Sequence, residues 1–392
     1  METLLITGII VLALAIILAV DYFGPNSIRL RDSIAFGMKC LRAKELIVQQ
    51  SDSKGNIWAS RGFILYKLSQ GSTRFMKHSR IPVGFSLFWL NNFSVFRKLT
   101  LRAECIEMVI DPDGTICTFC AGSLWQKRES DRHFKKTGTM PNFGRKVGRG
   151  VMTHGLMAAG NGVFYFGEYF NNPDRIGVAI YEYNENARQW IKVYMFSPGQ
   201  IRHIHSLQSD PYTGILWVCT GDENDEPMIG WSDDGFKSIY PIGQGSQIWR
   251  ACQLVFTEEA IYWGTDTGSE ELSGMYRWDK QKKELERLNK TEGALFYSTR
   301  LADGTIVMST DREKFPNEKD NRTRLYLLDQ SGKITNIICG SWDYSKPGFR
   351  FNFAKLRLQR NQGNPDLIVS VLNQKEFDDG ELLIFNSSSL LH

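Results

Sequence analysis

The chain has 392 residues, of which 42% are hydrophobic and 12% aromatic, with 7 cysteines and a formal net charge of +4. This composition is too apolar for a disordered chain, too poor in glycine for collagen and too poor in cysteine for a disulfide scaffold. So small a net charge on so long a chain gives no general attraction to nucleic acid, and we expect no nucleic acid partner.

The amino terminus is predicted to be a membrane anchor. Residues 3–20 carry no charge and are almost wholly aliphatic, which is the lower limit of length for a helix that spans a bilayer. A cleaved signal peptide is the alternative, but Met1-Glu2 supplies no basic segment before the apolar run. Basic residues follow the span between positions 29 and 44, which favours a single-pass protein whose main domain is cytoplasmic.

From about residue 45 onward, short runs rich in Val, Ile, Phe, Tyr and Trp alternate with Gly, Asp and Asn turns, a pattern typical of an all-β chain. Four of these runs end in small residues followed by an acid: Glu168, Asp222, Asp266 and Asp311. Successive acids are 54, 44 and 45 residues apart. A period of roughly 40 to 50 residues with several strands per repeat is typical of β-propeller blades.

We therefore predict an all-β protein with a transmembrane anchor over residues 1–22, a linker over 23–44 and a β-propeller over 45–392. Seven blades are favoured over six, with the first blade near 55–100. A strand near Glu45 to Gln49 is expected to complete the last blade, so that the ring closes without a free sheet edge. The stretch Ser232 to Ile239 is close to the Asp-box pattern S-x-D-x-G-x-[ST]-W, in which Ser and Asp side chains bind local backbone amides.

Propeller geometry places the end of the second strand of a blade at the same rim as the start of the first strand. The acids Glu168, Asp222 and Asp266 are predicted to meet polar residues from strand starts at this rim, and Asp222 is placed in the catalytic set. The predicted substrate-binding set at the same rim is His154, Arg202, Gln247, Trp249, Arg250 and Asp266.

Two histidines at the start of one strand are the strongest chemical signal. The period of two along a strand puts His203 and His205 on one face, where two imidazoles can serve one metal ion or one substrate. The alternative is a pair of hydrogen-bonded core residues. The sequence identifies no metal or other cofactor beyond this pair of candidate ligands. Arg202 and Arg250 are predicted to bind a carboxylate through their guanidinium groups, and the alternative is ion pairing with Asp222 or Asp266.

Glu168 and Tyr169 are predicted as an acid beside a phenol, a pair that can act as base and nucleophile in glycoside chemistry. The alternative is a rim carboxylate that accepts backbone amides. Trp249 is predicted to offer an aromatic face to a sugar, against the alternative of packing between blades.

The stretch from Gly162 to Asp266 resembles the sialidase-like (BNR/Asp-box) β-propeller proteins associated with exopolysaccharide and surface-glycan gene clusters of bacteria and archaea. The resemblance rests on Gly167-Glu168-Tyr169, Arg202-His203-Ile204-His205, Gly221-Asp222, Gln247 with Arg250, and Thr265-Asp266. It implies a propeller with a role in glycan metabolism. The sialidase signature Arg-Ile-Pro occurs at positions 80–82, but it follows a strand instead of opening the first blade, so sialidase activity is not expected.

The leading hypothesis is a membrane-anchored propeller that acts on a surface polysaccharide or exopolysaccharide, as a glycoside hydrolase or polysaccharide lyase on an anionic sugar. The alternative is a non-catalytic propeller that binds a glycan or a protein at the same rim. A third hypothesis, a structural scaffold, predicts that the acids and arginines of the rim satisfy one another.

Overall fold

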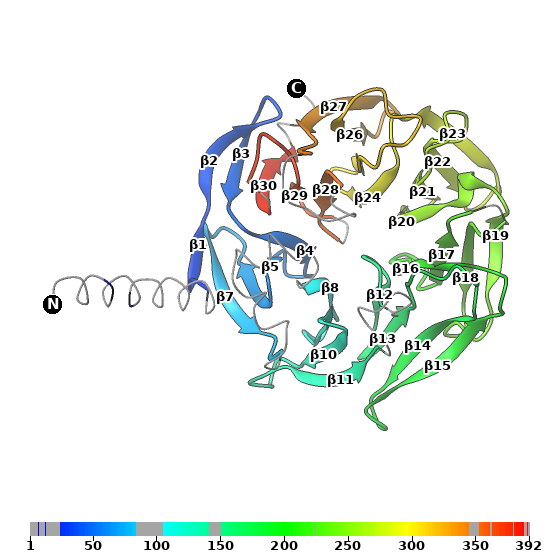
Figure 1. Cartoon of the computed structure of the whole chain (residues 1–392), viewed down its shortest axis with the longest axis horizontal. Helices are drawn as coiled ribbons and strands as arrows, with labels where there is room; N and C mark the ends of the chain where they lie inside the picture. The colour runs from blue at the N-terminus through cyan, green and yellow to red at the C-terminus, as the bar shows by residue number, and fades with distance from the viewer. Residues whose placement is uncertain are drawn as a thin grey trace.

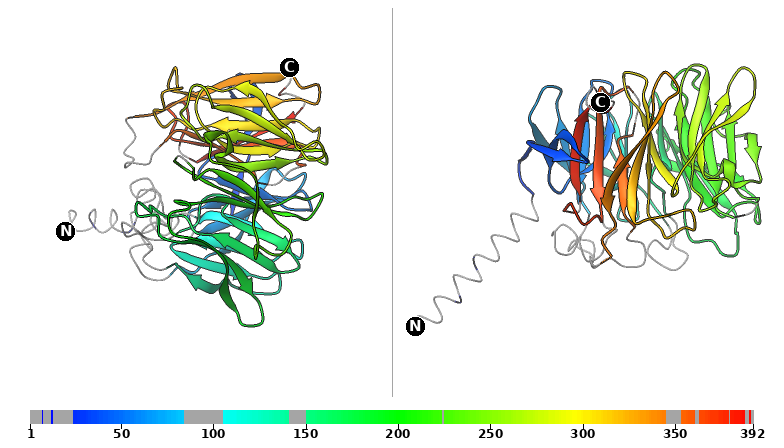
Figure 2. Two further views of the ribbon diagram at one scale, coloured as in Figure 1. Left: turned by 90° about the vertical axis from the view of Figure 1, so that its right-hand side faces the viewer. Right: turned by 90° about the horizontal axis from the view of Figure 1, so that it is seen from above.

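The computed structural model describes residues 24–83, 105–140, 150–223, 225–344, 353–360, 363–378, 380–387 and 390, together with Thr7 and Leu12. Seven antiparallel sheets form a ring around a central axis (Figure 1), which confirms the seven-blade propeller. In the side views the ring is a disc, and the strands cross its short dimension (Figure 2). Within the described ranges no helix is long and apolar enough to cross a bilayer. The predicted anchor lies outside those ranges, apart from Thr7 and Leu12.

Each blade has its first strand nearest the axis and its later strands farther out. In blades 1 to 3 the strands are β4 (Ile47–Ser51), β5 (Ile57–Arg61), β6 (Ile64–Leu68) and β7 (Arg74–Arg80); β8 (Cys105–Ile110), β9 (Ile116–Cys120), β10 (Ser123–Lys127) and β11 (Lys135–Thr139); and β12 (Leu156–Gly160), β13 (Val163–Gly167), β14 (Val178–Asn184) and β15 (Gln189–Phe196).

Blades 4 to 6 repeat the same order. Their strands are β16 (His203–Ser209), β17 (Leu216–Gly221), β18 (Met228–Ser232) and β19 (Tyr240–Gln244); β20 (Ala251–Phe256), β21 (Ala260–Thr265), β22 (Gly274–Asp279) and β23 (Leu285–Lys290); and β24 (Leu295–Arg300), β25 (Ile306–Thr310), β26 (Arg322–Leu328) and β27 (Ile334–Ser341). A short 3-10 helix, η2 (Gln247–Trp249), leads into blade 5.

Blade 7 joins the two ends of the propeller. It combines β28 (Lys355–Leu358), β29 (Asp366–Leu372) and β30 (Glu381–Asn386) with β3 (Met38–Ala43) and β2 (Arg31–Ala35). Leu41 of β3 pairs with Ile384 of β30, and the two strands lie side by side in Figure 1. The preceding strand β1 (Ser27–Arg29) is the outermost strand of blade 1, where it pairs with β7. The amino-terminal strands therefore cover the outer edges of both blades at the closure.

Three expectations change as a result. The segment 23–44, predicted as a linker, carries β1, β2 and β3. The strand near Glu45 to Gln49 belongs to β4, the innermost strand of blade 1, and β3 closes the ring in its place. Blade 1 accordingly spans 47–80 instead of 55–100, because its first strand precedes the turn that was taken as its start.

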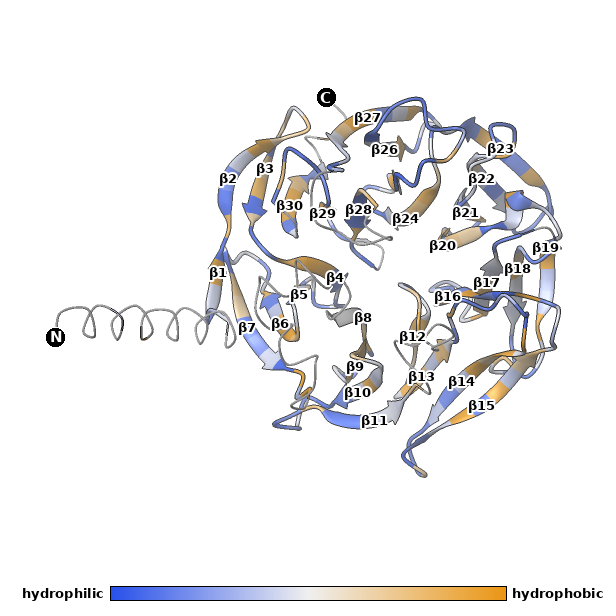
Figure 3. Cartoon of the chain, in the orientation of Figure 1, coloured by the Kyte–Doolittle hydropathy of each residue, from blue (hydrophilic) through white to orange (hydrophobic). Residues whose placement is uncertain are grey.

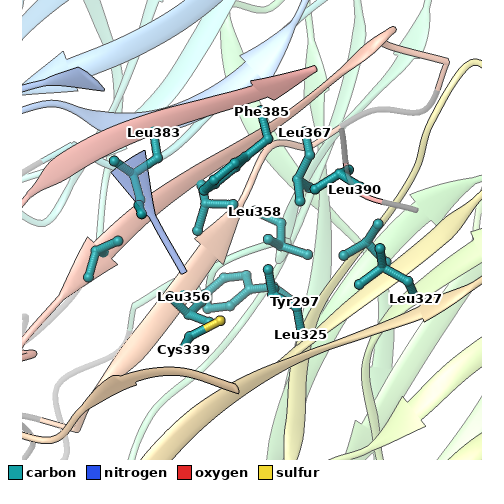
Figure 4. Close-up of a cluster of buried hydrophobic side chains, with 14 of the residues drawn as sticks. Tyr297, Leu325, Leu327, Cys339, Leu356, Leu358, Leu367, Leu383, Phe385 and Leu390 are labelled. Carbon is teal, nitrogen blue, oxygen red and sulfur yellow. The ribbon is translucent and has the colours of Figure 1, made fainter. Parts of the chain in front are cut away.

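The hydrophobic core is divided among the interfaces between blades. One cluster joins Tyr297, Leu325 and Leu327 of blade 6 to Leu356 and Phe385 of blade 7 (Figure 4), and another joins blades 7 and 1. The outer strands β15 and β23 mix polar and apolar residues and are largely exposed or half-buried (Figure 3). Because the apolar faces meet one another, polar side chains remain available for the axis and the two rims.

The turn predicted from the Asp-box pattern has the expected local hydrogen bonds. The Ser232 Oγ atom accepts from the backbone N–H of Phe236 at 2.9 Å, and Asp234 Oδ1 accepts from the N–H of Ser238 at 2.9 Å. Gly235 has a φ of 75°, a left-handed conformation that glycine adopts without strain. This turn stabilises a hairpin of blade 4 and takes no part in the rim described next.

Candidate functional site

Strand pairing brings the polar residues of blades 4 and 5 to one rim of the ring. His203 at the start of β16 pairs with Gly221 at the end of β17, and Asp222 follows directly. In blade 5, Ala251 pairs with Thr265, so that Arg250 and Asp266 lie side by side. The prediction that strand starts and second-strand ends share a rim therefore describes these two blades.

Asp222 is the centre of this rim. Its Oδ1 atom lies 3.1 Å from His205 Nε2 and 3.2 Å from Arg250 Nη2. Its Oδ2 atom lies 3.1 Å from Arg202 Nη1 and 3.2 Å from His203 Nε2. We call these five residues the Asp222 cluster. The histidines are buried beneath the carboxylate, whereas the Arg202 and Arg250 side chains are 27% and 17% exposed, so the arginines form its solvent side.

Gln247 and Arg250 fix the backbone of Asp222. The Gln247 amide donates to the Asp222 carbonyl oxygen at 2.8 Å, and Arg250 Nη1 donates to the same oxygen at 3.1 Å. The 3-10 turn of η2 holds Gln247 in position, because the Ser246 side chain accepts from Ile248 N. Gln247, predicted to bind substrate, here supports the residue that the rest of the cluster surrounds.

Each histidine of the cluster has an oxygen acceptor at both ring nitrogens. His203 Nδ1 lies 3.2 Å from the Phe170 carbonyl oxygen and His205 Nδ1 lies 3.2 Å from that of Ala251, while both Nε2 atoms face Asp222. A neutral imidazole has one N–H, so each neutral ring leaves one lone pair directed at an oxygen. Protonation of both rings, or one divalent cation bound by both Nε2 atoms, would remove these lone-pair contacts.

The geometry fits a metal ion. One ligand atom from each of His203, His205 and Asp222 lies within 4.8 Å of the others. Metal-bound histidines commonly donate the second ring N–H to a backbone carbonyl, which is the arrangement of both Nδ1 atoms here. His205 also belongs to a second trio of this kind with Cys252 and Asp266, but burial raises the pKa of the Cys252 thiol well above its usual value and disfavours the thiolate that a metal requires.

The electrostatics of the Asp222 cluster are dominated by burial and by these contacts. Burial by itself would raise the pKa of Asp222, but hydrogen bonds from His203 and His205 outweigh it and hold the pKa well below its usual range. Burial lowers the pKa of His203, although Asp222 opposes the shift. The carboxylate therefore stays ionised, and His203 resists becoming an imidazolium.

A second group of charges continues the rim across blades 5 to 7. Arg250 Nη2 lies 3.1 Å from Asp266 Oδ2, and Asp311 Oδ2 lies 2.8 Å from Lys355 Nζ. Glu313 interacts electrostatically with all four of these residues, and burial followed by the charge of Asp266 raises its pKa to about 8. Burial raises the pKa of Asp311 to about 6, against the opposing effect of Lys355.

Asp311 is one of the repeat acids predicted from the sequence, whereas Glu313 and Lys355 were not predicted to have a role. Both carry a positional signal that could have found them. Glu313 stands two residues after a second-strand acid, and Lys355 is the first residue of an inner strand. The sequence also predicts Arg350 as a strand-start residue of blade 7, and it lies outside the described residues.

Glu168 and Tyr169 lie beside the Asp222 cluster but differ in what they contact. The buried Glu168 carboxylate accepts from Ala179 N at 2.9 Å and from the Tyr181 hydroxyl at 3.4 Å. It therefore binds groups of its own blade, in line with the alternative prediction of a carboxylate that accepts backbone amides. The Tyr169 ring packs on the ring of His203 with centroids 4.1 Å apart. Tyr169 thus borders the cluster, whereas the Glu168 carboxylate is held by β14.

Trp249 and His154 do not present groups to this rim. Trp249 is buried and stacks on Trp263 with ring centroids 5.5 Å apart, and a Cβ atom at Gly243 would meet its ring at 2.0 Å. It packs between blades 4 and 5, as the alternative prediction expects, and offers no free face to a sugar. His154 is buried with its ring against Tyr297, and burial, with Arg360 and Arg357, lowers its pKa well below the usual value.

Comparison with solved structures supports the propeller fold. The sequence matches no protein-family model and no curated protein. Among solved structures, it is similar to an oligogalacturonate lyase in complex with manganese, with a TM-score of 0.60 and 9% identity over 92% of this chain and 96% of that one. An oligogalacturonate lyase from Vibrio parahaemolyticus gives a TM-score of 0.58 at 9% identity, over 92% and 98% of the two chains.

A third similar structure, U3-55K, gives a TM-score of 0.51 at 12% identity over 91% of this chain and 98% of that one. At such identities the likeness establishes the propeller fold alone. The resemblance to sialidase-like proteins stays a prediction from the sequence.

Proposed function

We propose that this propeller is a metal-dependent enzyme that acts on an acidic saccharide at the Asp222 cluster, most simply as a lyase. The observation that carries the proposal is the convergence of two imidazole Nε2 atoms and one carboxylate within 4.8 Å, with both Nδ1 atoms facing backbone carbonyls. The similarity to oligogalacturonate lyases, one of them in complex with manganese, supports the choice of an anionic sugar and of lyase over hydrolase chemistry. Anchoring by residues 1–22 and a surface polysaccharide as substrate remain predictions.

The five residues of the Asp222 cluster would have two different roles. His203, His205 and Asp222 would hold the cation, which supplies positive charge for a substrate carboxylate as negative charge develops beside it. Arg202 and Arg250, on the solvent side, orient that carboxylate. Each neutral imidazole directs a lone pair at an oxygen atom, and a bound cation would remove this unfavourable contact. The histidines therefore favour a metal site over the scaffold hypothesis, whereas the ion pairs of the rim fit both hypotheses.

Glu313 is the proposed proton carrier. In a β-elimination its carboxylate removes the proton next to the sugar carboxylate, a carbon–carbon double bond forms, and the carbon–oxygen bond to the leaving sugar breaks. Glu313 then returns the proton to the leaving oxygen, so no further reactant is needed. A carboxyl group with a raised pKa is suited to both steps.

The test of the proposal is to load the full chain with Mn²⁺ and to incubate it with oligogalacturonate. We expect about one bound ion per chain, measured by calorimetry, and an ultraviolet absorbance from the unsaturated product that disappears with a chelator. Absence of both Mn²⁺ binding and turnover would refute the proposed function.

The affinity for Mn²⁺ is expected to fall as the pH is lowered. Protons compete for the two Nε2 atoms, so binding must release protons wherever the free histidines are protonated. Because burial lowers the pKa of His203, this competition begins at a lower pH than for an exposed histidine. Calorimetry in buffers of different ionisation enthalpy measures the number of protons released, and a pH-independent affinity would exclude histidine ligands.

The Glu313→Gln variant is expected to lose turnover by about a hundredfold or more, since a positioned general base contributes about that much. In the parent protein, kcat/KM should rise with pH and level off near the pKa of about 8, because the base acts in its ionised form. Glu258→Gln, at an exposed position of blade 5, is the matched control and should leave both quantities unchanged. A Glu313→Gln variant with the parent pH profile would remove Glu313 from the mechanism.

A further inference from the structure

A large cavity opens at the other end of the axis, away from the Asp222 cluster. It has a volume of about 960 Å³ and is lined by residues from all seven blades. Its wall includes the last residues of inner strands, such as Ser51, Ile110 and Arg300, whereas the Asp222 cluster lies where inner strands begin. The lining extends outward between blades 1 and 2 to Trp58, Lys67 and Lys127, so the cavity reaches beyond the central channel of the ring.

Two lysines in this wall have no acidic partner among the described residues. Lys127 is only 8% exposed, and its ammonium has a single hydrogen bond, of 3.4 Å, to the Arg128 carbonyl oxygen. The Lys67 ammonium lies 5.3 Å from the centre of the Trp58 ring. A buried ammonium without a counter-ion is costly, and a bound anion would remove that cost.

Four acids line the same wall, and none of them forms an ion pair with Lys67 or Lys127: Asp52, Asp111, Asp113 and Glu129. Asp52 accepts from the side chains of Asn56 and Trp58, with distances of 2.9 Å from Asn56 Nδ2 and from Trp58 Nε1 to Oδ2. Asp113 accepts from the backbone N–H of Thr115 at 2.8 Å. Asp52 and Asp113 stabilise the hairpins between first and second strands and form no ion pair with Lys67 or Lys127, so both ammonium groups keep an unpaired positive charge beside these acids.

Nearer the axis the cavity offers polar groups without charge. Gln50 Nε2 and Ser298 Oγ are buried and have no hydrogen-bond partner within the described part of the chain, and both residues line the cavity. They are 2% and 3% exposed. Buried donors without a partner are rare, and hydroxyl groups of a ligand are suitable partners for an amide and a hydroxyl.

We infer that this cavity is a second binding site, for an acidic saccharide whose carboxylate lies against Lys67 and Lys127 and whose hydroxyl groups lie toward Gln50 and Ser298. A hydroxylated anion matches both halves of the wall, and the volume accommodates more than one sugar ring. The site shares no residue with the Asp222 cluster, so it stands or falls separately from the proposed function.

The test measures binding of trigalacturonate to the full chain in the presence of a chelator, by calorimetry, and compares it with the neutral galactose trimer and with inorganic phosphate. We expect binding of trigalacturonate, and about tenfold to hundredfold weaker binding by Lys127→Met, in line with the loss of one charged hydrogen bond. Lys237→Met, which alters an exposed lysine of blade 4, is the control and should bind as the parent does.

Lys127→Met should melt at or above the temperature of the parent, because it removes an unpaired buried charge. If it fails to fold, Lys67→Met takes its place and should show the same direction of change. Equal binding of neutral and acidic trimers, binding of phosphate alone, or unchanged affinity in the lysine variants would each overturn the inference.

Discussion

Replacing Asp222 by asparagine is expected to abolish Mn²⁺ binding and turnover and to destabilise blades 4 and 5. The substitution removes the charge that His203, His205, Arg202 and Arg250 share. Loss of one partner of a largely buried ion pair costs about 3 to 5 kcal/mol, and the partial exposure of the arginines places the expected loss in the free energy of unfolding at or below about 3 kcal/mol.

Denaturant unfolding with and without Mn²⁺ separates the metal-site and scaffold readings of the cluster. If the cluster holds a cation, Mn²⁺ stabilises the parent protein by mass action and leaves Asp222→Asn unaffected. If the cluster is only a scaffold, Mn²⁺ changes neither protein, and the variant is destabilised equally in both conditions. Asp225→Asn, on the same loop and exposed, is the matched control and should respond to Mn²⁺ as the parent does.

The parts of the rim that follow the blade repeat could be predicted from the sequence. The recurrent acids placed Asp222 and Asp266, and the period of two in β16 placed His203 and His205 on one side, although the register shifts between Ile204 and Ser206. Such a bulge adds a residue to one strand without an evident sequence signal. Both rings and the carboxylate belong to blade 4, and their pairing depends on how β16 and β17 are aligned at this bulge.

Other residues depended on details that the repeat does not contain. Trp249 stands before a strand start of blade 5, but the absence of a side chain at Gly243 of blade 4 leaves space for its ring, so it packs between the two blades. Glu313 and Lys355 come from blades 6 and 7, and Glu313 interacts with Lys355 and with Asp266 of blade 5 only where these blades pack side by side. Lys67 and Lys127 belong to the first two blades, where the repeat is weakest, so no pattern drew attention to them.

Removal of residues 1–43 is expected to prevent stable folding, whereas removal of residues 1–22 is expected to leave the melting temperature unchanged. The longer deletion takes away β1, β2 and β3, and so exposes the backbone edges of β30 and β7. It also removes Leu30, Cys40 and Ala43 from buried clusters. Each large buried apolar side chain contributes about 1.5 to 3 kcal/mol, and free sheet edges invite aggregation.

One buried charge adds to the cost of the longer deletion. Arg42 of β3 forms an ion pair with Glu381, whose side chain is fully buried. Without its partner, such a carboxylate costs about 3 to 5 kcal/mol, which together with the lost apolar contacts approaches the whole stability of a typical domain, about 5 to 15 kcal/mol. Arg42→Ala in the full chain isolates this part and should lower the melting temperature without loss of solubility. A soluble chain beginning at residue 44 with the parent melting temperature would show that blades 1 and 7 close the ring without the amino-terminal strands.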